Sequence, residues 1–267
     1  MLPIEALTPN EALDLRGLLF DLDDTFLEHG LLTCEALTAL DLLKGSGLKL
    51  IALTGRPIAW AQTLAHVLPV SGAIGENGAV AFFREGRRIV ARDSVSPEVR
   101  AERRDRLRAL VRRVQDEVPA LIPADDTSAR VSDFTFDIGE HERAREEDIE
   151  QATRIAREAG ARVTRSSVHL HLTWDRLDKA TGAVRFLAER GHDSTEILRR
   201  FAFIGDSEND APCFAAFRTT IGVRNLRGRF HLLPRFQTKL AQSHGFLEAA
   251  RRISAARNVI PPPLSSS

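Results

Sequence analysis

Short apolar runs alternate with amphipathic stretches in the first and last thirds of the chain. The runs end in polar or acidic residues, as buried parallel strands do when they carry side chains at their carboxyl ends. The stretches between them have the length and spacing of helices. Strand followed by helix, repeated, predicts a doubly wound parallel sheet of the α/β class. We expect strands near residues 16–21, 48–53, 201–204 and 219–223, and helices near residues 34–43, 57–68 and 209–217.

The pattern changes in the middle of the chain. Alternation of polar and apolar residues there is typical of antiparallel strands with one covered face. The alternating segments are separated by helical stretches, so this part predicts a small α+β unit. Its expected elements are an arginine-rich helix at Pro97–Val118, a strand at Asp133–Ile138, a helix at Glu146–Ala159 and a strand at Val168–Trp174.

These two patterns predict two domains. We expect the α/β core to comprise residues 1–84 and 176–267, with the α+β unit inserted at residues 85–175. An insert of this length is large enough for a small domain. The chain crosses between the two parts near residues 84 and 176, and we expect the hinge there.

Each alternating strand of the insert has one polar and one apolar face. The polar faces could form a roof over a substrate, and a solvated sheet face is an equally good interpretation for each residue. His-x-His can bind zinc, but neither a cysteine nor further nearby histidines support a zinc site. The arginine-rich helix is typical of a solvated face. The polar residues are His169, His171 and Thr173 on one strand and Asp133, Thr135 and Asp137 on the other.

Composition and charge narrow the classes of protein to consider. With 267 residues, 43% hydrophobic and 28% charged, the chain has the balance of a folded globular protein. Lys+Arg and Asp+Glu are 37 each, so no net charge would attract nucleic acid or an anionic membrane. No run approaches the roughly 18 apolar residues of a membrane-spanning helix. Cys34 and Cys213 are expected to be free thiols in a reducing compartment, which favours the cytoplasm.

An acidic cluster follows the first predicted strand, in the sequence Asp21-Leu-Asp23-Asp24-Thr25. Ligands bind at the carboxyl ends of strands in open α/β sheets. Carboxylates gathered there repel one another unless a cation joins them, and oxygen ligands favour Mg²⁺. Capping of the next helix is an equally good local interpretation.

A second acidic cluster, Gly205-Asp206-Ser207-Glu208-Asn209-Asp210, ends a later strand. Alone it could be a helix start, with Ser207 as the cap and Asp210 in the first turn. The two clusters together are more informative, because strand ends in one parallel sheet can converge on a single metal and phosphate.

Two further segments suit phosphate. Thr54-Gly55-Arg56 combines a hydroxyl, a glycine and a helix N-terminus, which can hold phosphate oxygens, although it can also be a simple turn. Lys179 follows the insert just ahead of a helix, in a chain whose basic residues are mostly arginine. Lysine binds phosphate as a compact charge, and a solvated surface lysine is the alternative.

In this order, the four segments resemble the four sequence motifs of the haloacid dehalogenase superfamily of phosphatases. The resemblance covers about residues 15–83 and 176–254. The position of the insert and the segment Glu76-Asn77-Gly78 look like the sugar-phosphatase branch with a large α/β cap domain. That branch includes the sucrose-phosphate, trehalose-phosphate and mannosyl-phosphoglycerate phosphatases and phosphomannomutase.

The resemblance implies a role for each motif residue. Asp21 would attack phosphorus, and Asp23 would protonate the leaving oxygen and then activate water. The implied catalytic residues are Asp21, Asp23, Thr54 and Lys179. The implied substrate-binding residues are Thr54, Gly55, Arg56, Asn77, Lys179 and Asn209. The implied ligands of Mg²⁺ are the Asp21 carboxylate, the Asp23 carbonyl and Asp206, with Asp210 completing the metal site.

The function expected from the sequence is Mg²⁺-dependent hydrolysis of a small phosphorylated metabolite, above all a sugar phosphate, through an aspartyl phosphate. A sugar phosphomutase would use the same intermediate and is the main alternative. A phospho-receiver protein is disfavoured by the large insert and by Asp23. A non-catalytic sugar-phosphate-binding relative is disfavoured by the intact acidic and lysine motifs.

Overall fold

The computed structural model describes residues 1–166, 168–227 and 232–257, so the part of the expected core from residue 258 onward lies outside the described residues. A nine-stranded sheet forms the larger part, with the order β1-β12-β11-β10-β2-β3-β4-β5-β6. Neighbours from β1 to β4 are parallel, and β4, β5 and β6 are antiparallel. The strands are β1 (Leu2–Pro3), β2 (Gly17–Phe20), β3 (Lys49–Leu53), β4 (Gly72–Gly75), β5 (Val80–Glu85), β6 (Arg88–Asp93), β10 (Phe201–Ser207), β11 (Thr219–Arg227) and β12 (Phe236–Gln237).

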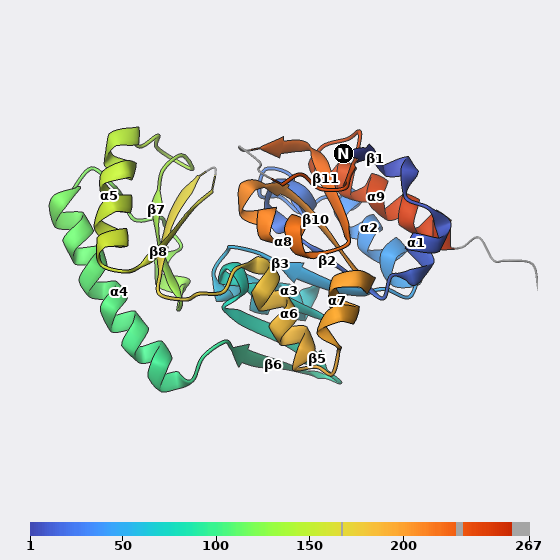
Figure 1. Cartoon of the computed structure of the whole chain (residues 1–267), viewed down its shortest axis with the longest axis horizontal. Coiled ribbons are helices and arrows are strands. Elements are labelled where there is room, and N and C mark those ends of the chain that lie inside the picture. Colours follow the sequence, from blue (N-terminus) through green and yellow to red (C-terminus); the bar gives the residue numbers. More distant parts are fainter. Residues whose placement is uncertain (167, 228–231, 258–267) are drawn as a thin grey trace, which may run out of the picture.

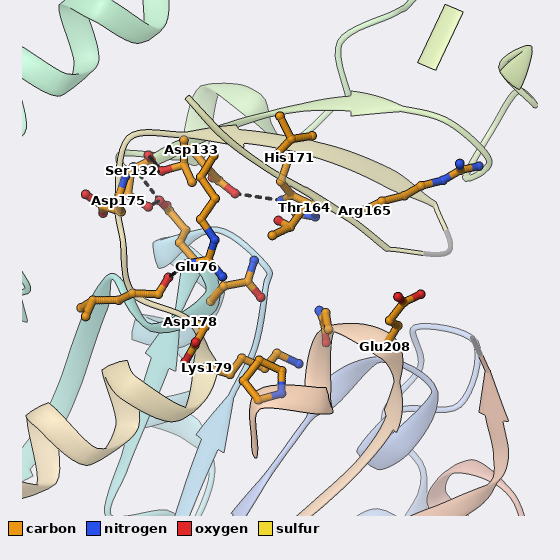
Figure 2. A pocket seen from close by; sticks show the side chains of 17 residues that line it. Glu76, Ser132, Asp133, Thr164, Arg165, His171, Asp175, Asp178, Lys179 and Glu208 are labelled. Carbon is orange, nitrogen blue, oxygen red and sulfur yellow. Dashed lines mark hydrogen bonds and ion pairs between the residues drawn. The ribbon is translucent and has the colours of Figure 1, made fainter. Parts of the chain in front are cut away.

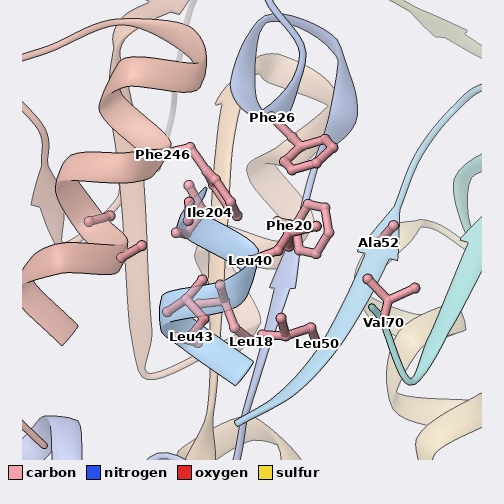
Figure 3. Packing of buried hydrophobic residues seen from close by; sticks show 14 of the residues in the cluster. Leu18, Phe20, Phe26, Leu40, Leu43, Leu50, Ala52, Val70, Ile204 and Phe246 are labelled. Carbon is pink, nitrogen blue, oxygen red and sulfur yellow. The ribbon is translucent and has the colours of Figure 1, made fainter. Parts of the chain in front are cut away.

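Helices cover both faces of this sheet because its central strands are apolar on both sides. Leu18 and Phe20 of β2 pack into the cluster formed with α1, α2, α3 and α9, whereas Leu19 packs into the cluster formed with α6, α7 and α8. Figure 3 shows the first cluster, where the rings of Phe20, Phe26 and Phe246 pack in tilted and edge-to-face arrangements with centroids 5.1–5.4 Å apart. The helices are α1 (Pro9–Asp14), α2 (Cys34–Gly45), α3 (Ile58–Val67), α6 (Lys179–Ala188), α7 (Ser194–Arg200), α8 (Ala211–Ala216) and α9 (Gln242–Arg257).

A second, smaller part lies between β6 and α6. Its antiparallel sheet has the order β7-β9-β8, from Asp133–Asp137, His169–Thr173 and Arg162–Arg165 respectively. Helices α4 (Pro97–Glu117) and α5 (Glu146–Glu158) pack on one face through a separate apolar cluster. In Figure 1 the sheet lies between these helices and the large sheet. The other face, which carries the polar residues, is therefore turned toward the core.

The predicted fold class is confirmed: a mostly parallel α/β sheet carries an α+β insert. One boundary differs, since β6 pairs with β5 along its whole length and so belongs to the large sheet. The second sheet and its helices thus begin after Asp93, rather than at residue 85. In the described residues, no helix is both long and apolar enough to cross a membrane.

Candidate active site

The two acidic clusters meet at one edge of the large sheet. Strands β2 and β10 are parallel neighbours, with Phe20 opposite Ile204, and the amide of Asp21 donates to the Ile204 carbonyl at 2.9 Å. Because both strands end here, carboxylate oxygens of Asp21, Asp206 and Asp210 lie within 4.8 Å of one another. All three side chains are buried.

Lys179 lies inside this acidic cluster. Its Nζ donates to Asp21 Oδ1 and to Asp210 Oδ1, both at 2.7 Å, and its side chain is only 1% exposed. Burial lowers the pKa of this ammonium, but the two carboxylates outweigh burial and hold the pKa above its usual range. The lysine is therefore charged, and it joins the first and last motifs.

The position of Lys179 follows from how α6 begins. Asp178 caps the helix by accepting from the Thr181 amide at 2.8 Å, which makes Lys179 the first helical residue. Gly182 then packs on Gly78, where a Cβ on either glycine would collide with backbone of the other segment. This close approach presses the start of α6 against the core.

Asp210 organises the cluster rather than leaving its oxygens free. Its Oδ2 accepts from the amides of Asp206 at 2.9 Å and Ser207 at 3.1 Å, while Lys179 occupies Oδ1. Gly205 allows this arrangement, because a Cβ there would overlap the Asp210 carboxylate. Asp21 and Asp206 consequently keep more oxygen lone pairs for a cation.

The charge of the cluster fits a divalent cation. Burial, and then the neighbouring carboxylates, raise the pKa of Asp206 to about 9. Burial also raises the pKa of Asp21 to about 7, although Lys179 opposes that shift. The metal-free cluster therefore retains protons at neutral pH, and a bound cation would displace them. An oxygen-rich site of this kind suits a hard divalent ion.

Thr54 and Gly55 follow β3, Asn77 follows β4, and hydrogen bonds join these two loops beside the cluster. Thr54 is fully buried, and its Oγ1 accepts from the Arg56 amide at 3.0 Å. Asn77 donates its amide to the Thr54 carbonyl at 3.0 Å and has a left-handed backbone, with φ of 54°. The Oδ1 atom of Asn77 is buried without a hydrogen-bond partner among the described residues. The two loops thus bring Gly55 and Asn77 to the cleft while Thr54 stays behind it.

Arg56 has a different partner from the one implied by the resemblance. Its Nε donates to both carboxylate oxygens of Asp23 at 2.9 Å, and its Nη2 donates to Oδ1 at 2.7 Å. The Asp23 carboxylate is therefore held by arginine and is not part of the three-carboxylate cluster. Asn209 lines the cleft and accepts from Ser207 Oγ at 3.1 Å.

The cleft lies between the large sheet and the polar face of the insert. One cavity of about 660 Å³ is lined by Asp21, Asp23, Asp206 and His169, among other residues. A second cavity of about 390 Å³ is lined in part by Lys179. Both cavities share His171 and Asn209. Figure 2 shows Asp133, Ser132 and His171 above and Lys179, Asp178 and Glu208 below.

Four of the six residues of this polar face line the cavities, as a roof would require: His169, His171, Thr173 and Asp133. Thr135 is fully buried and donates to Asp126 Oδ1 at 3.3 Å. His171 Nδ1 lies 2.8 Å from Asp133 Oδ2, and His169 Nε2 lies 2.7 Å from Glu140 Oε2, all four at the cavities. Asp137 differs. Its carboxylate accepts from four successive amides, Gly139 to Glu142, and so shapes a turn instead.

Two contacts from the insert to the core were not predicted. Arg130 is buried between Asp126 and Asp133, and its Nη1 donates to the Gly55 carbonyl at 2.9 Å. Glu76 accepts from the Ser132 amide at 2.6 Å and from Ser132 Oγ at 2.5 Å. Both insert residues come from the irregular segment before β7, where no periodicity marks them.

Known proteins resemble this chain along most of its length. The family model of haloacid dehalogenase-like hydrolases matches residues 18–105. A phosphoglycolate phosphatase of Archaeoglobus fulgidus is 27% identical over 246 residues, which are 91% of this chain and 98% of the relative.

Solved structures share the fold. Protein 0175 of Thermoplasma acidophilum has a TM-score of 0.72 at 18% identity, covering 90% of this chain and 98% of that one. The sucrose-phosphatase of Synechocystis, solved with sucrose and phosphate, has a TM-score of 0.66 at 18% identity, with the same coverage. The matched family model, the shared fold and the phosphatase names of the relatives agree with the order of motifs in the sequence, so this chain is similar to the haloacid dehalogenase-like hydrolases and, among them, to phosphatases.

Proposed function

We propose that this chain is a Mg²⁺-dependent phosphomonoester hydrolase that passes the phosphoryl group of a small metabolite first to Asp21 and then to water. One observation carries the proposal: the buried Lys179 ammonium joins Asp21 and Asp210 within reach of Asp206. A cation and clustered carboxylates at the carboxyl edge of a parallel sheet suit binding and transfer of a phosphoryl group.

The proposed reaction has two steps. A carboxylate oxygen of Asp21 attacks phosphorus, and the leaving oxygen takes a proton from Asp23 as its bond to phosphorus breaks. Asp23 then removes a proton from water, whose oxygen attacks the aspartyl phosphate and releases inorganic phosphate with Asp21 restored. Lys179 Nζ holds a phosphoryl oxygen in both steps.

The carboxylates of Asp21 and Asp206 and the carbonyl of Asp23 would hold Mg²⁺, with Asp210 positioning that group. When bound, the ion supplies the positive charge that the cluster lacks and lowers the repulsion between Asp21 and an anionic substrate. Oxygen donors alone favour Mg²⁺ over softer ions.

We further propose that the insert is a cap domain that closes over the substrate. The Arg130 contact to Gly55 and the Ser132 contacts to Glu76 tie it to the core beside the phosphate-binding loop. Closure would exclude water and so strengthen the attraction between Lys179 and the phosphoryl group.

The polar residues of the roof favour a substrate whose leaving group carries hydroxyls, such as a sugar or polyol. His171 Nδ1 faces a carboxylate, which only accepts, so this nitrogen carries the proton. Burial lowers the pKa of His171, so the ring is neutral near pH 7 and Nε2 can only accept. A substrate hydroxyl can donate to it, whereas a carboxylate cannot.

Phosphoglycolate is the second candidate substrate, because the Archaeoglobus phosphoglycolate phosphatase aligns with nearly the whole chain. Its carboxylate would need donors in the roof. Arg130 and the two histidines given above are each already paired with acids, as is Arg165 with Glu146 at the smaller cavity. Arg162 at the same cavity donates to the Leu177 carbonyl and is the arginine there that could turn to a substrate carboxylate. We therefore place hydroxylated phosphomonoesters first, and direct comparison of kcat/KM for the two classes decides between them.

The test is phosphate release from a panel of phosphorylated metabolites, with Mg²⁺ and with a chelator. Asp21→Asn keeps the size of the side chain but removes the nucleophile, so we expect a loss of at least about 1,000-fold in kcat with unchanged thermal unfolding. Wild-type turnover by this variant would refute the mechanism. Phosphate release that requires a bisphosphate activator would indicate the mutase instead.

A further inference from the structure

We propose that Arg56 is a positioning residue: it orients the Asp23 carboxyl group, which carries the proton taken from water in the previous turnover, for transfer of that proton to the leaving group, and it does not bind the phosphoryl group. The inference rests on the proposed function, in which Asp23 is the acid. It assigns Arg56 a task different from the one that its motif implies.

The contact between the two side chains fixes an orientation as well as a distance. Three N–H···O bonds of 2.7–2.9 Å join the guanidinium to both oxygens of Asp23. A fork of this kind holds a carboxylate in the plane of the guanidinium. The Asp23 side chain is 46% exposed, so without the fork it could turn freely in the cleft.

Arg56 is itself held in place. Its guanidinium lies over the Trp60 ring, with its central carbon 4.2 Å from the ring centroid. Its backbone is fixed at both polar atoms, since the amide donates to Thr54 Oγ1 and the carbonyl accepts from the Glu76 amide, each at 3.0 Å. A rigid arginine can impose its geometry on a mobile aspartate.

The donors of Arg56 argue against phosphoryl binding. Asp23 uses Nε and Nη2, so a phosphoryl oxygen that took the Nε hydrogen or the bonded Nη2 hydrogen would release the acid from its support. A phosphoryl oxygen could otherwise reach only Nη1 and the second Nη2 hydrogen, which lie outside the fork. Lys179 already lies against the nucleophile from the opposite motif, with its Nζ 2.7 Å from Asp21. The phosphoryl group therefore has a cation without Arg56.

Leaving-group dependence separates the two roles. A p-nitrophenolate leaves with little help from an acid, whereas an alkoxide such as that of glycerol 2-phosphate needs a proton. The ratio kcat/KM reports the steps up to departure of the leaving group, so the later work of Asp23 as a base does not enter. We compare both esters in Arg56→Lys, Asp23→Asn and the double variant, with thermal unfolding measured for each.

We expect Arg56→Lys to lower kcat/KM for glycerol 2-phosphate by about 10–100-fold and for p-nitrophenyl phosphate by less than about 3-fold. In the Asp23→Asn background, Arg56→Lys should lower kcat/KM for either ester no further. Inhibition by inorganic phosphate should be unchanged. Arg113→Lys, in a solvent-exposed arginine–glutamate pair on α4, is the matched control.

Equal losses for both esters, persisting in Asp23→Asn with weaker phosphate inhibition, would overturn the proposal and assign Arg56 to the phosphoryl group. If Arg56→Lys does not fold, Trp60→Leu removes only the stacking platform of the arginine. It should again impair the alkyl ester more than the aryl ester, and equal effects would contradict the proposal. Neither result depends on Asp21→Asn, which tests the phosphatase mechanism itself.

Discussion

At the scale of single residues, the buried charges explain one another. Lys179 is charged because Asp21 and Asp210 surround it, and Asp210 holds its place because amides and Lys179 occupy both its oxygens. Removing one member of such a group leaves the others buried and uncompensated. We therefore expect each of these side chains to contribute to stability as well as to the proposed chemistry.

Lys179→Ala should lower kcat/KM for all phosphomonoesters by a similar factor, about 100–1,000-fold, because the ammonium acts on the phosphoryl group that they share. It should also lower the unfolding free energy of the metal-free protein by about 3–5 kcal/mol, since two buried carboxylates lose their cation. Steady-state kinetics and denaturant unfolding check both. Lys239→Ala, in an exposed ion pair with Glu5, is the control. A loss confined to alkyl esters would assign Lys179 to the leaving group instead.

At the scale of elements, one sheet serves two purposes through its two faces. The apolar face of β7 and β9 packs on α4 and α5, and the polar face lines the cleft. Register decides which residues meet: Thr135 lies opposite His171 and Asp133 opposite Thr173. The diagonal neighbours His171 and Asp133 are then joined by the hydrogen bond of the roof, in which Nδ1 donates to the carboxylate.

His171→Asn should test this roof, because the asparagine amide can still donate to Asp133 while the acceptor Nε2 is lost. We expect kcat/KM for the preferred hydroxylated phosphate to fall by about 10-fold, the value of one hydrogen bond, with p-nitrophenyl phosphate nearly unchanged. His192→Asn, which replaces a histidine beside Lys49 in the core, is the control. Equal losses on both substrates in a normally folded protein would remove the specificity role.

At the scale of the whole molecule, Glu76 joins the two parts. The carboxylate lies in the core loop and accepts from Val131 and Ser132 of the insert and from the Ile58 amide. Burial, and then the Asp133 charge, raise the pKa of Glu76 to about 7, against the hydrogen bonds that lower it. The protonated carboxyl is thus favoured in the folded state relative to the unfolded chain.

This shift predicts a pH dependence of stability. A raised folded-state pKa gives a contribution that is complete below about pH 4.5 and is lost as the pH rises through about 7. The Tm of the wild-type protein should therefore fall relative to that of Glu76→Gln as the pH rises from 5 to 8. We expect a relative fall of a few degrees, because about 1 kcal/mol corresponds to roughly 2–4 °C for a protein of this size. Thermal unfolding of both proteins across this range, without added metal, measures the difference. A difference in Tm between the two proteins that stays constant from pH 5 to 8 would show that Glu76 does not titrate in this range.

The local sequence determined the parallel core, the acidic clusters and the polar face of the insert. The parallel core followed from apolar runs, because a strand buried on both faces must be apolar throughout. The acidic clusters were found because strand ends in one parallel sheet share an edge, and the structure brings Asp21, Asp206 and Asp210 together there. The polar face of β7 and β9 followed from alternation with a period of two residues.

Partners distant along the chain were decided by the tertiary structure alone. Periodicity assigns a side chain to a face but not to a partner, so the sequence did not indicate that Arg56 pairs with Asp23 or that Arg130 reaches the Gly55 carbonyl. Nor did it indicate that β6 extends the large sheet, because an exposed hairpin strand has no long apolar run. These contacts depend on how the two parts pack, and packing determines which buried charges compensate one another.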